Sequence, residues 1–225
     1  MAVYSQRTEL HDCQRGAEDR FEDNLKKELL IVEGDSASKS VLRFRDRAFQ
    51  AVLPMQGKPL NAWKASPGAV AKNALYRRLI DALGAGWGAD FDSQRVAFGR
   101  VLMLFDPDAD GIHCGVLVSL FFHRWMPELI EAGRLFVVRP PLFEIDVAGS
   151  DQRFPAYTED DLRQKMTLLT AETGREVGYR RFRGLASLPA TILQDGCLNP
   201  VTRRAERIND KDIRAMKRIF HMPDA

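Results

Sequence analysis

The chain has 225 residues, of which 45% are hydrophobic and 28% charged, so it can bury one substantial core and carry an appendage. It contains no run of about 18 consecutive apolar residues, and its first residues are too polar for a signal peptide. We therefore expect a cytoplasmic protein with no membrane partner. Cys13, Cys114 and Cys197 are far apart and share no Cys-x-x-Cys spacing, which argues against a disulfide framework or a zinc site. A metal ion would have to be held by oxygen ligands.

The net charge of +2 hides an uneven distribution along the chain. Between Arg175 and Arg218 there are eleven Lys and Arg side chains against five Asp and Glu, a local net charge of +6. Such a surplus suits a phosphate backbone. A solvated surface or a disordered basic tail explains the charge alone equally well.

Short apolar runs alternate with helical patterns after a polar lead-in at residues 1–27. The runs predict buried strands, and apolar residues at helical spacing predict the helices between them. In chain order we expect a strand at 29–32, a helix at 68–83 closed by Gly84, a strand at 101–105, a helix at 115–132 followed by Gly133, and a strand at 135–138.

Strands that alternate with helices predict an α/β fold with a mainly parallel sheet flanked by helices, which we place at residues 28–148. From 149 to 225 the pattern weakens and Arg accumulates, which predicts an irregular basic C-terminal appendage. Sites in parallel sheets lie at the carboxyl ends of strands. Glu33 and Asp106 both follow predicted strands, so they could share one sheet edge although they are 73 positions apart.

The strongest local signal is Asp106, Asp108 and Asp110 at alternate positions, followed by Gly111. In an extended backbone these side chains would point the same way, and such concentrated charge needs a cation or protons. Mg²⁺ is the natural cation, because it binds a few carboxylates together with waters and substrate phosphates. A plain turn remains an alternative, whereas a Ca²⁺ loop needs a Glu six positions after the glycine, where Leu117 stands.

Several long segments occur in a fixed order along the chain. They are ELLIVEGDSA at 28–37, FQAVLPMQGKPLN at 49–61, IDALGAGWGADFD at 80–92, VLMLFDPDADGIH at 101–113, MPELIEAGRLFVVRPPLFEI at 126–145, RRFRGL at 180–185 and LNPVTRR at 198–204. Through them the chain resembles the Toprim part of type IIA DNA topoisomerase B subunits, the gyrase B and topoisomerase IV B kind. The resemblance implies the Rossmann-like Toprim fold.

The resemblance also implies Mg²⁺-dependent DNA cleavage and religation, with Mn²⁺ as an alternative ion and a tyrosine supplied by a partner A-type subunit. By similarity, Glu33 and Asp106 would hold the ion nearest the scissile phosphate. Asp106 and Asp108 would hold a second ion, and Asp110 would support the cluster. Lys58 would act on the DNA near the catalytic centre. The further expected DNA contacts are Arg181, Arg183, Arg203 and Arg204.

The sequence departs from the family pattern at several of these segments. Gln56 and Gly115 stand where basic residues are expected, Ser187 replaces an acidic residue, and Ser38 and Lys39 replace glycines. In the family these segments face DNA or the A-type partner, so the departures bear on strand passage more than on metal binding.

No phosphate-binding glycine loop occurs in the chain, so we expect no ATP site in it and assign ATP hydrolysis to a separate ATPase-domain chain. Two other functions remain open at this level. One is a DNA- or partner-binding Toprim paralogue without catalysis, and the other is a stand-alone Toprim nuclease that uses water as its nucleophile.

Overall fold

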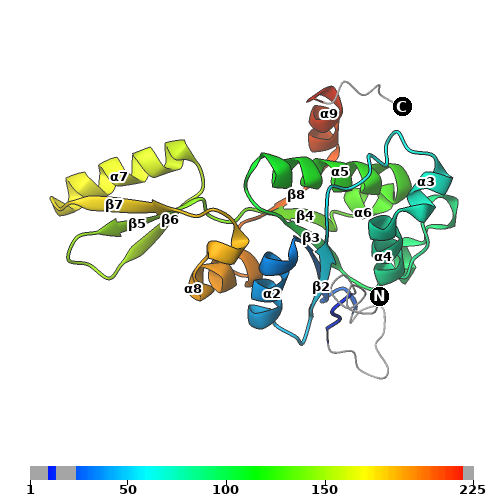
Figure 1. Cartoon of the computed structure of the whole chain (residues 1–225), viewed down its shortest axis with the longest axis horizontal. Coiled ribbons are helices and arrows are strands. Elements are labelled where there is room, and N and C mark those ends of the chain that lie inside the picture. Colours follow the sequence, from blue (N-terminus) through cyan, green and yellow to red (C-terminus); the bar gives the residue numbers. More distant parts are fainter. Residues whose placement is uncertain (1–9, 14–23, 220–225) are drawn as a thin grey trace.

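The computed structural model describes residues 10–13 and 24–219, which form two sheets (Figure 1). The main sheet has the strand order β2-β1-β3-β4-β8, and the small sheet has the order β6-β5-β7. The strands are β1 (Glu28–Glu33), β2 (Gln50–Met55), β3 (Arg100–Leu104), β4 (Leu135–Val138), β5 (Phe143–Val147), β6 (Arg153–Ala156), β7 (Val177–Arg181) and β8 (Ala205–Arg207).

The helices of the described residues connect and cover these strands. They are α2 (Asp35–Phe44), α3 (Pro67–Lys72), α4 (Ala74–Leu83), α5 (Ala109–Trp125), α6 (Pro127–Glu131), α7 (Glu159–Thr173), α8 (Ala190–Leu193) and α9 (Asp210–Ile219), with short 3₁₀ turns η1 (Gly88–Asp90), η2 (Ser93–Arg95) and η3 (Leu185–Ser187) and a π-helical turn η4 (Gln194–Leu198). None of these helices combines the length and the apolar composition of a membrane span.

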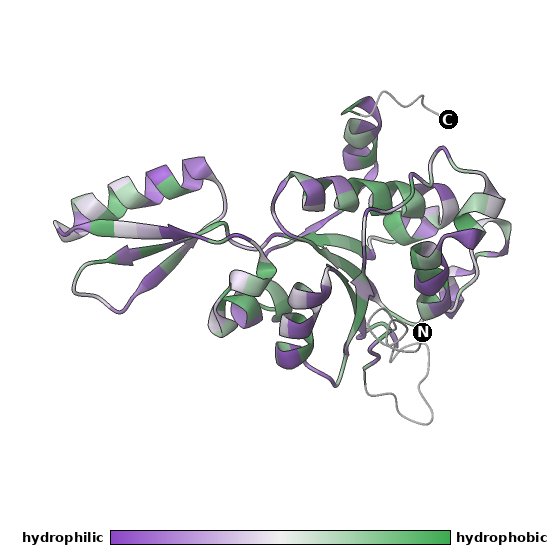
Figure 2. Ribbon diagram, viewed as in Figure 1, coloured by the Kyte–Doolittle hydropathy of each residue, from purple (hydrophilic) through white to green (hydrophobic). Residues whose placement is uncertain are grey.

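The main sheet is buried on both faces. β1, β2, β3 and β4 run parallel, and β8 pairs antiparallel with β4 at one edge. Leu29 and Ile31 of β1 pack toward α4 and α5, whereas Leu30 and Val32 pack toward α2 and α8. Burial of both faces explains why β1 is one continuous apolar run. Figure 2 shows the centre of the main sheet in the green of hydrophobic residues. The predicted α/β class with a mainly parallel, helix-flanked sheet is confirmed.

The predicted strands at 29–32, 101–105 and 135–138 correspond to β1, β3 and β4. The sequence did not predict β2, because Pro54 interrupts its apolar run. Proline is tolerated there because β2 lies at the edge of the main sheet, where its missing N–H removes little from the ladder.

Both predicted helices are interrupted. The helix expected at 68–83 is α3 followed by α4, because the side chain of Asn73 accepts hydrogen bonds from the N–H groups of Leu75 and Tyr76 and starts a new helix. Gly84 ends α4 with φ 67°, as predicted. The second helix starts earlier than expected, at Ala109, and Pro127 divides it into α5 and α6.

The chain after residue 149 is more regular than the sequence indicated. Together with β5, the elements β6, β7 and α7 form a small unit at residues 143–181, which projects from one end of the molecule in Figure 1. β8 then returns to the main sheet. The proposed division at residues 148 and 149 therefore falls inside the small sheet, since β5 precedes it and β6 and β7 follow it.

Candidate metal centre and nucleic-acid interface

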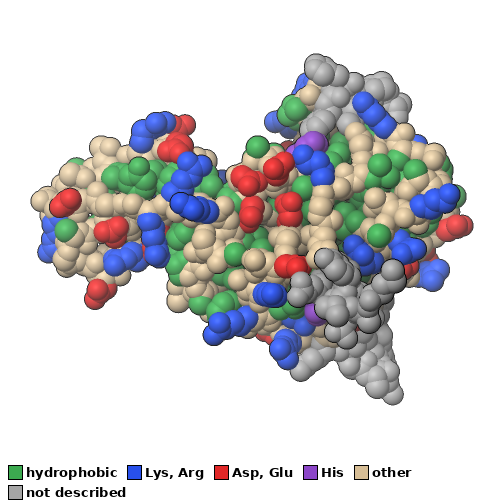
Figure 3. Space-filling model, in the orientation of Figure 1, with side chains coloured by type: hydrophobic (Ala, Val, Ile, Leu, Met, Phe, Trp, Pro, Cys, Tyr) green, Lys and Arg blue, Asp and Glu red, His purple; other side chains and the backbone are tan. Residues whose placement is uncertain are grey.

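Glu33 and Asp106 lie at the same edge of the main sheet. β1 and β3 are adjacent and parallel, with Val32 opposite Leu104, so the residues that follow them emerge side by side. Figure 3 shows Asp and Glu side chains gathered near the middle of this face, with Lys and Arg side chains on both sides. The edge predicted from sequence therefore exists, and it is acidic at its centre.

Glu33 is half-buried and contacts a thiol that sequence reasoning gave no role. The Sγ of Cys114, on α5, lies 3.6 Å from Glu33 Oε1 and donates a hydrogen bond to it. Burial and the charges of the three aspartates raise the pKa of Glu33, and the Cys114 hydrogen bond opposes this rise. Burial and the nearby carboxylate raise the pKa of Cys114 to about 12, so the thiol stays protonated and remains a donor.

Asp106 is held by a segment that is distant in sequence. The backbone N–H of Leu185 donates a hydrogen bond of 2.8 Å to Asp106 Oδ1. Burial raises the pKa of Asp106, the Leu185 hydrogen bond lowers it, and the charge of Asp108 raises it further, with a net upward shift. The RRFRGL segment therefore supports the acidic cluster through its backbone.

The alternate spacing of Asp108 and Asp110 suggested an extended backbone, but both residues lie at the start of a helix. Asp108 is the N-cap of α5, and its Oδ1 accepts a hydrogen bond of 2.8 Å from Gly111 N. Asp110 lies in the first turn of α5, where it is 79% exposed and pairs with Lys58 at 3.1 Å. A Cβ at Gly111 would lie 2.0 Å from the backbone oxygen of Asp106, which explains the glycine of this motif. The start of α5, with its positive dipole end, thus borders the cluster.

The carboxylates of Glu33 and Asp106 suit a hard cation that takes its remaining ligands from water and phosphate. Within residues 10–13 and 24–219, no three His, Cys, Asp or Glu side chains form a preassembled metal cage. Mg²⁺ does not need one, because it keeps several waters and binds through one or two carboxylates together with phosphate oxygens. Burial, together with the neighbouring carboxylates, raises the pKa of Glu33 and of Asp106, and a bound cation would favour the charged form of both groups. The donor set therefore fits Mg²⁺.

Four of the predicted DNA-binding side chains are accessible, and three of them form exposed ion pairs: Lys58 with Asp110, Arg181 with Glu159 at 3.9 Å, and Arg204 with Glu206. Lys58 and Arg181 are at least half exposed, and Arg183 is exposed. Arg204 is 52% exposed, pairs with Glu206 at 3.3 Å, and lies over the ring of Tyr157 at 5.1 Å. These side chains remain available to a phosphate backbone.

Arg203 corrects the sequence prediction. Its side chain is 2% exposed and forms a two-pronged ion pair with Glu28, with a hydrogen bond of 2.6 Å to Glu28 Oε2. It also donates to the backbone oxygen of Leu198 at 3.2 Å. A guanidinium enclosed in this way joins the C-terminal region to the start of β1 and cannot contact DNA.

Two of the departures from the family pattern have local structural roles. Ser187 Oγ accepts a hydrogen bond of 3.0 Å from Arg183 N and donates one of 2.7 Å to Gly184 O, which closes the turn after β7. Gln56 Nε2 donates to Asp35 Oδ1 at 2.7 Å. Ser187 and Gln56, which stand in place of the family residues, thus stabilise the loops that border the acidic cluster.

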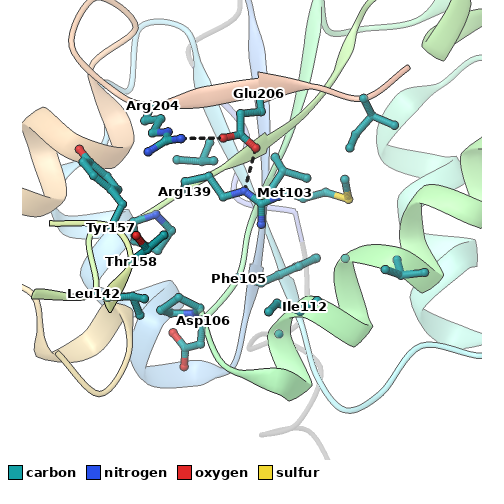
Figure 4. Close-up of a pocket in the computed structure, with 18 of the residues that line it drawn as sticks. Met103, Phe105, Asp106, Ile112, Arg139, Leu142, Tyr157, Thr158, Arg204 and Glu206 are labelled. Atoms are coloured by element: carbon teal, nitrogen blue, oxygen red, sulfur yellow. Dashed lines mark hydrogen bonds and ion pairs between the residues drawn. The ribbon is translucent and has the colours of Figure 1, made fainter. Parts of the chain in front are cut away.

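A pocket of about 470 Å³ lies beside Asp106 (Figure 4). Phe105 and Ile112 contribute apolar surface, and Gly115 also lines it. Asp106 lies at one side, and the ion pairs of Arg139 and Arg204 with Glu206 lie at the other (Figure 4). The pocket separates the start of α5 from the small unit.

Comparisons with known proteins agree with this architecture. Residues 28–140 match the Toprim domain family. The chain is 38% identical over 197 residues to the gyrase B protein of Thermotoga maritima, an alignment that covers 88% of this chain and 30% of that protein. It is 35% identical over 193 residues to the topoisomerase 4 B protein of Bacillus subtilis, covering 86% and 29%. The corresponding Staphylococcus aureus protein is 37% identical over 197 residues, covering 86% and 29%.

The chain therefore spans only about 30% of the length of the curated relatives it matches. The matched segment 28–140 contains β1 to β4, the parallel part of the main sheet, and both acidic motifs. The family match covers the parallel part of the main sheet, and we conclude that this chain belongs to the Toprim domain family and is homologous to part of the gyrase B and topoisomerase IV B proteins.

Proposed function

We propose that the chain is the Mg²⁺-binding Toprim part of a type IIA topoisomerase-like complex, which cleaves and religates DNA with a tyrosine-bearing A-type subunit. The observation that carries this proposal is the convergence of Glu33 and Asp106 at the ends of adjacent parallel strands. Asp108 joins them from the start of α5. The homology to the gyrase B and topoisomerase IV B proteins supports the class of reaction.

Each acidic residue has a proposed task. Glu33 and Asp106 would hold one ion, Mg²⁺ or alternatively Mn²⁺, while Asp106 and Asp108 would hold a second and Asp110 would support the cluster. The bound ion would supply charge stabilisation at the reacting phosphate. The protonated thiol of Cys114 orients Glu33 by its hydrogen bond.

The basic residues would bind the DNA backbone. Lys58 is held by Asp110 at 3.1 Å, and both groups are at least half exposed, so a phosphate can replace Asp110 at little cost. Arg181, Arg183 and Arg204 would contact further phosphates. We place the complex in the cytoplasm, with DNA, the A-type subunit and an ATPase domain outside these 225 residues as its partners.

A plasmid cleavage assay tests this function. The chain, an A-type subunit of the same organism, Mg²⁺ and supercoiled DNA should yield breaks with protein attached covalently to the DNA ends. Asp106→Asn should lower the yield on the order of 100-fold, because both ions lose a ligand and the charge stabilisation that they would supply is weakened. Cys114→Ser should change it little, because a serine hydroxyl also donates a hydrogen bond to Glu33.

The same assay separates the alternatives. A stand-alone nuclease would break the DNA without the A-type subunit and would leave no protein attached. A non-catalytic paralogue would bind DNA and Mg²⁺ and produce no breaks under either condition. Either result would replace the proposed function.

A further inference from the structure

The turn at Gly184 and Leu185 binds one oxygen of the Asp106 carboxylate and leaves no room for a side chain at the other. Leu185 N donates to Asp106 Oδ1 at 2.8 Å. On the other side, a Cβ added to Gly184 would lie 2.6 Å from Asp106 Oδ2 and 2.9 Å from its Cγ. Backbone from 79 positions away therefore lies directly against the carboxylate.

Space, and not backbone conformation, requires glycine at position 184. Its φ of 164° is an extended value that any residue adopts. A larger residue would meet the Asp106 side chain first, since the three nearest atoms to the added Cβ all belong to that carboxylate. Gly184→Ala thus tests a single contact.

The turn is fixed independently of Asp106. Ser187 Oγ accepts hydrogen bonds from Arg183 N at 3.0 Å and from Gly184 N at 3.3 Å. Leu185 is fully buried, in a core cluster that includes Val41 of α2. These contacts make the turn a rigid support, and Asp106 is the group that must adapt to it.

We propose that the Gly184–Leu185 turn is a positioning element, which orients the Asp106 carboxylate for cation binding. The N–H on Oδ1 and the limited space between Gly184 and the carboxylate restrict rotation of the carboxylate about its Cβ–Cγ bond. A ligand that is already oriented loses less conformational freedom when it binds a metal ion. This inference rests on the proposed function, because it concerns the ligand geometry of the same site.

Calorimetric titration of the full chain with Mg²⁺, repeated with Mn²⁺, tests the proposal. Gly184→Ala should raise the Kd about tenfold or more, the range found when a residue that supports a metal ligand is changed. Gly178→Ala is the matched control. It adds the same methyl group 3.1 Å from the carboxylate of Asp146, outside the acidic cluster, and should leave the Kd unchanged.

A double-mutant cycle distinguishes positioning from general damage. If Gly184 acts through Asp106, then adding Gly184→Ala to Asp106→Asn should weaken the remaining ion binding no further. Unchanged affinity in Gly184→Ala, or a further loss in the double variant, would overturn the inference. A wild-type chain that binds neither ion would instead refute the proposed function, and this inference would fall with it.

Hydrogen exchange of the wild-type chain provides a readout that needs no variant to fold. Mg²⁺ should slow exchange of the Leu185 amide, because an ion on Asp106 fixes the acceptor of that N–H. The amide of Phe182, which donates to Leu142 O outside the cluster, should be unaffected. Equal exchange at Leu185 with and without the ion would contradict the positioning role.

Discussion

The carboxylate of Asp106 is subject to opposing influences. Burial and the charge of Asp108 raise its pKa, and the Leu185 N–H lowers it, with a net shift upward. The folded chain without metal therefore binds this proton more tightly than the unfolded chain does. The corresponding stabilisation is fully present below the ordinary carboxyl pKa and is lost as the pH rises through the raised value.

This raised pKa predicts that the charged form of Asp106 lowers the free energy of unfolding of the metal-free chain at neutral pH. In the absence of divalent metal, Asp106→Asn should raise the Tm at pH 7, because the amide keeps the acceptor for Leu185 and removes the charge. The gain should shrink as the pH falls through the acid range, where Asp106 is protonated in both states. Thermal melting across pH, with Asp146→Asn as the control, measures it. A variant less stable than wild type at pH 7 would contradict the assigned pKa direction.

Arg203 and Arg204 are adjacent in sequence, but their removal should change the free energy of unfolding by very different amounts. Arg203→Ala leaves Glu28 buried without its main partner and should cost about 3 kcal/mol of unfolding free energy. Arg204→Ala removes an exposed side chain and should cost less than about 1 kcal/mol. Denaturant unfolding measures both values. Loss of DNA binding in a fully stable Arg203→Ala variant would show that the buried ion pair is assigned wrongly.

At the scale of elements, the start of α5 combines a structural and a proposed chemical task in one residue. Asp108 caps the helix through its hydrogen bond with Gly111 N and contributes charge to the cluster. The cap needs an oxygen acceptor, whereas a cation needs a carboxylate. Serine satisfies the first need without the second.

Two substitutions therefore separate the tasks of Asp108. Asp108→Ala should lose about 1 kcal/mol through the cap, which lowers the Tm by about 2–4 °C. Asp108→Ser should retain the Tm of the metal-free protein. Both should reduce the rise in Tm that Mg²⁺ produces. Melting curves with and without Mg²⁺ give all four values, and a full Mg²⁺ response in Asp108→Ser would exclude Asp108 as a ligand.

The sequence predicts the elements whose signals are local. β1, β3 and β4 are continuous apolar runs, and burial on both faces makes such runs reliable. β2 contains Pro54, which is acceptable only at a sheet edge, and edge positions are not visible in a single sequence. The aspartates that begin α5 resemble a turn until the helix that follows them is placed.

At the scale of the whole molecule, charge is arranged around the cluster. Exposed basic side chains border the acidic centre on one face (Figure 3), so DNA would meet cations before it reached the carboxylates. A backbone-binding surface of this kind gives affinity that falls steeply with salt and depends little on sequence.

Salt dependence of DNA binding tests this surface. Arg181→Ala and Arg183→Ala should each weaken binding and reduce the slope of log K against log salt concentration by about one. Arg163→Ala, on the exposed side of α7, is the control for a general change in charge. Fluorescence anisotropy with duplexes of two unrelated sequences measures affinity and slope. An unchanged slope in both variants would leave these arginines as part of a solvated surface.

Long-range contacts mark the limit of what the sequence predicts. The shared edge of Glu33 and Asp106 follows from strand order, which alternating patterns suggest. The contact of Asp106 with Leu185 spans 79 positions, and the ion pair of Arg203 with Glu28 spans 175. The local net charge of +6 between Arg175 and Arg218 does not show which of these basic side chains is buried in the core.

The small unit leaves and re-enters the rest of the molecule through two neighbouring segments, joined where Phe182 N donates to Leu142 O at 2.8 Å. A single linker would let this unit swivel about any axis, whereas a two-stranded tether resists torsion and permits mainly bending. Bending at the tether would move the unit without pulling on the turn that follows it. Leu185, three residues beyond Phe182, is fully buried, so the hydrogen-bond donor of Asp106 would stay in place while the unit changes its angle.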